Sequence, residues 1–189
     1  MDIDFIMDRV KNHVATFTDY GNIKILDFKS PNTIEYRIRF LFEEDYYRLH
    51  ISGDLGELIA TNYNNMTYEK FSDFVDNTGY FESKIDCCNR PLYYYDEDDA
   101  RADLLTYLKD NDYDDSDVRP YSKLEYFVDE VIEDYNNGTG LGSAGYKLLS
   151  EYITDAWEIA GDLGKRRSDI LELYMLMFKL AQAQLDSKE

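Results

Sequence analysis

The hydrophobic and polar positions of the first 63 residues predict one helix followed by a small antiparallel sheet. Residues 3–17 carry apolar side chains at spacings of three and four, which is typical of an amphipathic helix. Apolar and polar side chains alternate over residues 34–42 and again over 47–52, and this period of two indicates strands. Shorter segments at 23–28 and 57–63 are also expected to be strands. Turn residues between these segments favour a meander of antiparallel strands.

Helical periodicity dominates the middle of the chain. It predicts a helix over residues 67–75 and another that begins behind the acidic residues 96–99, where the helix macrodipole favours negative charge. Ser122 and Glu125 have the spacing of a capping box, and a strong apolar stripe follows them. We therefore expect a third helix to begin at this point.

The last fifty residues are also expected to be helical. A glycine-rich connection at 138–145 precedes one helix that contains residues 149–160 and another that begins at about residue 168. The run at 173–178 is apolar on all sides, which predicts burial at the centre of a bundle or against another subunit. A homodimer through this helix is the second form of that prediction.

These elements define the expected fold class as α+β. We predict an antiparallel sheet of three to four strands with helices on one face, together with a C-terminal helical subdomain. The expected domains are residues 1–118, with the first helix, the meander and further helices, and residues 119–189, with the helical subdomain. A chain of 189 residues is long enough to bury a hydrophobic core without disulfides or metals.

Composition points to a cytoplasmic protein without a cofactor or a bound metal. The N-terminus lacks the pattern of a signal peptide, and no apolar run approaches the roughly 18 residues of a membrane span. Cys87 and Cys88 are adjacent and are expected to be plain thiols. The segment 110–121 resembles a calcium loop but has Asp115 where the loop needs glycine and Tyr121 where it needs glutamate.

Charge is the most distinctive property of the sequence. The formal net charge is −19, and residues 61–136 hold 20 acidic and 7 basic side chains, a net charge of −13. Because phosphate binding depends on Lys and Arg, this charge argues against direct binding to DNA or to an anionic membrane. A basic protein surface, such as the nucleic-acid channel of another protein, would attract the chain.

Acidic residues and tyrosines gather in one stretch of sequence. Ten of the 22 residues from 96 to 117 are acidic, and three tyrosines precede them. Carboxylates and tyrosines together could occupy a groove that is built for phosphates and stacked bases, and tyrosine is a frequent interface anchor. The predicted partner-binding residues are Tyr93, Tyr94, Tyr95, Asp96, Glu97, Asp98, Asp99, Asp110, Asp112, Asp114, Asp115 and Asp117.

A basic cluster on the predicted sheet supports a different hypothesis. Arg37, Arg39, Arg48 and His50 occupy polar positions of two neighbouring strands and could meet on one side of the sheet. They could bind an anion or an RNA, with His50 as the general acid or base. The alternative is that packed helices supply Asp or Glu to neutralise the cluster.

The sequence contains no catalytic motif of high specificity. A G-x-G-x-x-G pattern at 140–145 follows a predicted helix, whereas the dinucleotide fingerprint follows a strand, so this segment is read as a helix–helix connection. An enzymatic function is therefore not predicted.

One resemblance concerns the residues Ile51-Ser-Gly-Asp-Leu-Gly-Glu-Leu-Ile59, the segment 71–74 and the motif Tyr80-Phe81-Glu-Ser-Lys84. This pattern resembles uncharacterised bacteriophage and prophage proteins of Gram-positive bacteria, and the small, acidic, tyrosine-rich chain is similar in character to phage anti-CRISPR inhibitors of Cas9. The resemblance implies a protein of the host cytosol that binds the basic nucleic-acid channel of a Cas9-like effector. Action on a guide RNA is the alternative that it implies, and no residue role carries over from the family.

Overall fold

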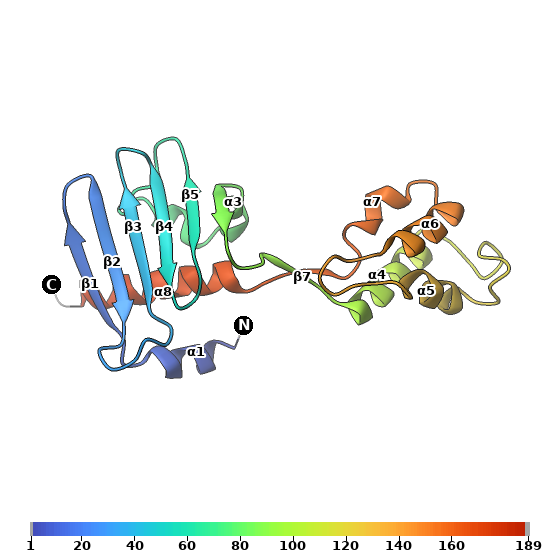
Figure 1. The fold of residues 1–189 in the computed structure, drawn as a ribbon, viewed down its shortest axis with the longest axis horizontal. Helices are drawn as coiled ribbons and strands as arrows, with labels where there is room; N and C mark the ends of the chain where they lie inside the picture. Colours follow the sequence, from blue (N-terminus) through green and yellow to red (C-terminus); the bar gives the residue numbers. More distant parts are fainter. Residues whose placement is uncertain (1, 188–189) are drawn as a thin grey trace. The chain divides into compact units, whose positions relative to one another are not determined.

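A computed structural model describes residues 2–187, and their fold is α+β (Figure 1). The chain forms two compact units. Unit 1 contains the residues up to Leu92 together with those from Asp169 onward, and unit 2 contains Tyr93–Ser168. The helical unit is therefore inserted between the last strand of the sheet and the last helix, whereas the sequence analysis placed a single boundary between residues 118 and 119.

Unit 1 is built on a six-stranded antiparallel sheet. Its strands follow one another in sequence order from β1 to β6, so every neighbouring pair is antiparallel. The strands are β1 (Val14–Asp19), β2 (Ile23–Lys29), β3 (Ile38–Glu43), β4 (Arg48–Gly53), β5 (Leu58–Thr61) and β6 (Ile85–Cys88). The helices of the unit are α1 (Ile3–Val10), α2 (Ser72–Val75), α3 (Thr78–Glu82) and α8 (Ile170–Asp186).

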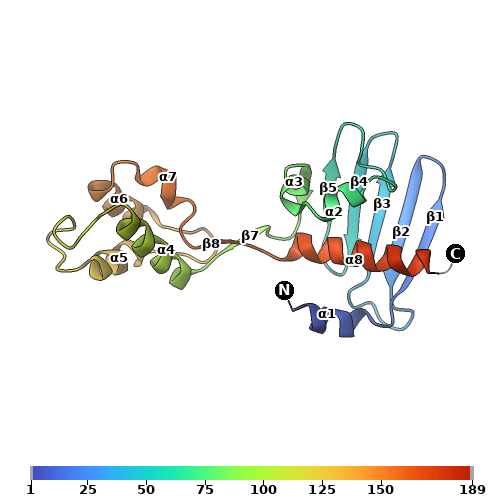
Figure 2. The same cartoon turned by 180° about the vertical axis from the view of Figure 1, so that it is seen from behind.

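Helix α8 covers one face of the sheet (Figure 2). The ring of Phe178 on this helix lies 5.3 Å from that of Phe40 and 4.8 Å from that of Phe71, measured between centroids. Leu26, Leu49 and the other inward residues of the strands are fully buried in the same cluster. The opposite face of the sheet has no helix of unit 1 over it among the described residues, and we call it the open face (Figure 1).

Unit 2 has a separate core made by its helices. Ala100, Leu104, Phe127, Val131 and Leu149 are among the buried side chains of this core. The elements are β7 (Tyr93–Tyr95), α4 (Glu97–Asp110), α5 (Leu124–Ile132), α6 (Ser143–Tyr152), α7 (Ala156–Ala160) and β8 (Lys165–Arg167). The entering strand β7 and the leaving strand β8 pair in antiparallel fashion.

The α+β class and the antiparallel meander are confirmed, but the sheet has six strands rather than three or four. The expected helix over 3–17 is wrong beyond Val10, because the segment from Val14 pairs with β2 and becomes an edge strand. Its alternating threonines are β-branched and suit that role. The four residues of β6 are too few for a period-two signal, and this strand was missed.

Other expected boundaries also shift. The strand predicted from residue 34 begins at Ile38, because Tyr36 has a φ of 56° and interrupts the extended backbone. The predicted capping box is wrong, since Lys123 holds the cap position of α5 and Asp115 accepts a hydrogen bond from the backbone N–H of Leu124 at 2.8 Å. The helix expected over 149–160 is broken by the extended backbone of Ile153.

The apolar run at 173–178 is buried by its own chain rather than by a bundle or a second subunit. Tyr174, Met175, Met177 and Phe178 all have at most 2% of their surface exposed. They contribute to the core between α8 and the sheet. The physical reason for expecting a homodimer through this helix is thereby removed.

Candidate functional site

The predicted acidic and tyrosine residues do not form one surface, because they lie at opposite ends of α4. Tyr93–Tyr95 and residues 96–99 lie at its start, and residues 110–117 lie at and beyond its end. A 14-residue α-helix at 1.5 Å per residue separates the two groups by about 20 Å. Each group therefore has to be judged separately.

The carboxylates at the start of α4 are largely paired within unit 2. Arg166 of β8 donates to both oxygens of Asp103 at 2.8 and 2.9 Å and lies 2.9 Å from Asp99. Arg101 pairs with Glu97 at 2.6 Å, and Asp96 accepts a hydrogen bond from the backbone N–H of Asp99 as the helix N-cap. This end of the helix therefore presents little free negative charge.

The tyrosines of β7 are placed beside a basic strand. Tyr93, Tyr94 and Tyr95 pair with Arg167, Arg166 and Lys165 of β8. The Lys165 ammonium group lies 4.8 Å from the centre of the Tyr93 ring. The sequence analysis missed these contacts because Arg166 and Asp103 are 63 residues apart. The visible signal was the run of three basic residues at 165–167, the only such run in the sequence.

The loop behind α4 keeps its carboxylates in solvent. The carboxylates of Asp110 and Asp112 are exposed and have no ion pair or hydrogen bond in the described part of the chain. Asp114 accepts hydrogen bonds from both the hydroxyl and the backbone N–H of Ser116, which lower the pKa of Asp114. Asp117 accepts from the Asp114 backbone N–H at 2.9 Å. These contacts shape the loop without neutralising it.

Helix α5 extends this acidic loop. Tyr126, Glu130 and Glu133 follow one another at spacings of four and three, which places them on one exposed side of the helix. Tyr126 is 55% exposed. We define the acidic surface as Asp110, Asp112, Asp114, Asp115, Asp117, Glu125, Tyr126, Glu130 and Glu133. Lys109, Arg119 and Lys123 are the basic residues of the same segments.

The basic cluster lies on the open face of the sheet, as expected for Arg39, Arg48 and His50. Its neutralising carboxylates come from neighbouring strands, not from packed helices. Arg39 donates two hydrogen bonds to Asp27, at 2.8 and 2.9 Å. Glu43 lies 3.0 Å from His50 Nε2 and 3.6 Å from Arg48. Arg48 and His50 therefore belong to a compensated group around Glu43.

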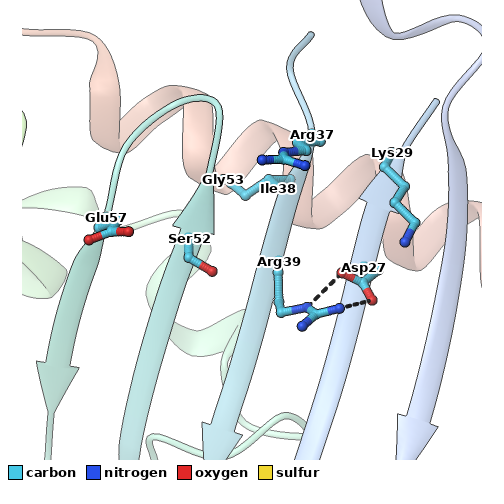
Figure 3. A pocket seen from close by; sticks show the side chains of 8 residues that line it. All are labelled: Asp27, Lys29, Arg37, Ile38, Arg39, Ser52, Gly53 and Glu57. Carbon is cyan, nitrogen blue, oxygen red and sulfur yellow. Dashed lines mark hydrogen bonds and ion pairs between the residues drawn. The ribbon is translucent and has the colours of Figure 1, made fainter. Parts of the chain in front are cut away.

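Arg37 does not join that group. It lies in the connection before β3 and lines a hollow of about 380 Å³ together with Lys29, Arg39 and Ser52 (Figure 3). The sequence analysis missed Lys29 and Ser52. The available signal was the alternation of polar positions on neighbouring strands, since Asp27, Arg39 and Ser52 lie opposite one another in the sheet register.

The open face does not combine its histidine with a nucleophile. Cys87 is exposed and opposes Ile59, which opposes His50. Two strand spacings of about 4.8 Å place Cys87 roughly 10 Å from His50, too far for a thiol–imidazole hydrogen bond. Within residues 2–187, moreover, no three His, Cys, Asp or Glu side chains are grouped as metal ligands.

Comparisons with models of protein families, with curated proteins and with solved structures find no match. The geometry of the two surfaces is therefore the basis for a functional assignment. Among the described residues, no helix is long and apolar enough to cross a membrane.

Proposed function

We propose that this protein is a binding protein whose acidic surface docks on a basic protein surface that otherwise holds nucleic acid. The observation that carries the proposal is the group of unpaired, exposed carboxylates beside Tyr126. Unit 2 contains 19 acidic and 8 basic side chains, a formal charge of −11 in 76 residues. Such a field attracts a basic partner and repels nucleic acid.

The arrangement of this surface suits an interface. Tyr126 offers an exposed aromatic ring, and aromatic residues at the centre of a charged patch are frequent hot spots of protein complexes. Glu130 and Glu133 are held on a regular helix, so few backbone degrees of freedom are lost on binding. The acidic surface replaces the set expected from the sequence, because the β7 tyrosines and residues 96–99 face basic partners of their own.

Inhibition by occupancy follows from this mode of binding. A partner whose nucleic-acid channel is filled by the acidic surface cannot hold its substrate. The resemblance to phage anti-CRISPR proteins makes a Cas9-like nuclease in the bacterial cytosol the partner that we propose. No catalytic step is required of the chain.

A DNA-cleavage assay tests the proposal. A Cas9-like nuclease loaded with its guide RNA is mixed with increasing amounts of the purified chain before target DNA is added. We expect cleavage and DNA binding to fall together, because the chain and the DNA compete for one surface. The triple variant Asp112→Asn/Glu130→Gln/Glu133→Gln should inhibit at least about tenfold less well, since each desolvated charge contact contributes on the order of 1 kcal/mol.

A variant with the same change of charge controls for nonspecific electrostatics. Asp4, Asp45 and Asp73 are exposed acidic residues of unit 1 that make no side-chain ion pair in the described structure. Their triple replacement by Asn should leave inhibition unchanged. Equal losses in both variants would show that only net charge matters, and the acidic surface would have no specific role.

A further inference from the structure

The hollow at the end of the open face contains the main excess of positive charge on the sheet. Lys29 ends β2, Arg39 and Ser52 lie on neighbouring positions of β3 and β4, and Arg37 closes the hollow from the connection before β3 (Figure 3). Three cations thus meet at one place on a chain of net charge −19.

Two of these cations have no internal partner. The side chains of Lys29 and Arg37 are exposed and make no ion pair or hydrogen bond among residues 2–187. Arg39 uses Nε and one terminal nitrogen on Asp27, which leaves its other terminal nitrogen outside that pair. Donors for an external ligand are therefore present on three side chains, with the Ser52 hydroxyl as a fourth.

Acidic residues do not cancel this charge. Asp27 and Glu57 also line the hollow. Asp27 already accepts both hydrogen bonds from Arg39, and the formal balance of the five charged side chains is +1.

The backbone holds Arg37 at the hollow. Its carbonyl oxygen accepts a hydrogen bond from the Asp54 backbone N–H at 3.0 Å. The preceding residue, Tyr36, donates its backbone N–H to the Asp54 carboxylate at 2.8 Å. Gly53 lies so close to the Arg37 carbonyl that any Cβ at this position would overlap with it. The two strand ends are thereby fixed against each other, so Arg37 has a defined place before any ligand binds.

From this arrangement we infer that the hollow binds the phosphate group of a small phosphorylated molecule or free inorganic phosphate. Guanidinium and ammonium groups with a hydroxyl donor are the usual ligands of a phosphate oxyanion. The outward positions of the six strands hold no Phe, Tyr or Trp, so the open face lacks platforms for stacking nucleic-acid bases. The site is independent of the acidic surface of unit 2.

Titration of the full-length ¹⁵N-labelled protein tests the inference. Inorganic phosphate and ribose 5-phosphate are added in separate experiments at constant ionic strength, with sodium chloride as the reference. We expect saturable NMR shifts confined to the residues around 29, 37–39 and 52–54. Shifts with both phosphate probes identify a site for the phosphate group, and shifts with ribose 5-phosphate alone identify a site for the phosphorylated small molecule.

Two single variants and one matched control make the test specific. Lys29→Gln and Arg37→Gln should each weaken phosphate binding about tenfold, because each removes one charge-assisted contact. Arg48→Gln removes the same charge from the same face, outside the hollow, and should leave the affinity unchanged. Equal weakening in all three variants would overturn the inference, as would shifts that chloride reproduces or tighter binding of an RNA oligonucleotide without a terminal phosphate.

Discussion

At the scale of single residues, the electrostatics of this protein depend on which charged side chains already have partners within the chain. Asp99 and Asp103 are close in sequence to Asp112, but both contact Arg166. The carboxylate of Asp112 contacts no cation within residues 2–187. The density of charge along the sequence therefore locates the acidic region but overstates its strength at the start of α4.

Gly53 is the residue on which the position of Arg37 depends. Its φ of 147° and its close approach to the Arg37 carbonyl leave no space for a side chain. We predict that Gly53→Ala lowers the free energy of unfolding by about 2–4 kcal/mol, through backbone strain and a forced shift of the strand end. Urea denaturation measures this change.

Gly21→Ala is the matched control for that variant. Gly21 also has a positive φ, 80°, but nothing lies within 4 Å of a Cβ built there. Backbone strain alone should cost about 1–2 kcal/mol. If both variants lose the same amount, the contact between Gly53 and Arg37 has no energetic role.

His13 predicts a pH dependence of folding. Its side chain is 3% exposed, its ring packs on Phe28, and burial lowers its pKa. The unfolded chain therefore binds a proton near the ordinary pKa of about 6.5, while the folded chain binds it only at lower pH. Stability should be fully present above that pH and should decrease as the pH falls through it.

Denaturation between about pH 5.5 and pH 7.5 measures this effect, because histidines are the side chains that ordinarily titrate in that range. His13→Leu should remove most of the slope. His50→Gln changes the other histidine of the sequence and should leave the slope in place. A slope that survives in His13→Leu would contradict the assignment.

At the scale of elements, the sequence predicted the structure wherever local periodicity was long and regular. The meander from β2 to β5 and the helices α4 and α5 were recognised, because each has a clear period of two or 3.6. The segment around Val14 was mistaken for helix, because its apolar spacing fits both structures and pairing with β2 decides between them. The pairing of β7 with β8 was invisible, because it joins residues more than sixty positions apart.

The candidate sites were predicted in part for the same reason. Residues of one local segment, such as Asp110 and Asp112, were correctly grouped and lie in one exposed loop. Contacts across the chain were not predictable, and they separate Arg37 from His50 and bring Arg166 to Asp103. Local sequence thus indicated which residues are charged, whereas tertiary contacts decide which of them remain available.

Helix α8 and the sheet are expected to depend on each other. Phe178 is fully buried, with the rings of Phe40, Phe42 and Phe71 around it. Phe178→Ala should lower the stability of unit 1 by about 3–5 kcal/mol, because it removes apolar contacts and leaves a cavity. Hydrogen exchange at increasing denaturant, read for peptides of each unit, measures the effect.

Phe127→Ala is the corresponding change in unit 2, where Phe127 is also fully buried. It should accelerate exchange in unit 2 and leave the strands of unit 1 protected. Equal loss of protection in both units from either variant would contradict the presence of two separate cores.

At the scale of the whole molecule, the inserted position of unit 2 predicts that it folds by itself. Its first and last strands pair through Tyr93 and Arg167, so its two ends lie about 5 Å apart. A fragment of residues 93–168 should show helical circular dichroism and a cooperative thermal transition. A fragment without such a transition would show that unit 2 needs unit 1 to fold.

The two units also divide the charge of the molecule. Unit 2 carries the acidic surface, and unit 1 carries the hollow with its unpaired Lys29 and Arg37. Binding of a basic protein and binding of a phosphate group are therefore expected to be separable by mutation. Loss of one activity with retention of the other would support this division.

The central claim is that the acidic surface binds a basic protein partner, and the salt dependence of that complex tests it most directly. Affinity for a guide-loaded Cas9-like nuclease is measured between about 50 and about 500 mM sodium chloride, where the screening length falls below 10 Å. We predict a steep loss of affinity with salt and a shallower dependence for Asp112→Asn/Glu130→Gln/Glu133→Gln. Absence of binding at low salt, or an affinity that salt does not change, would contradict the claim.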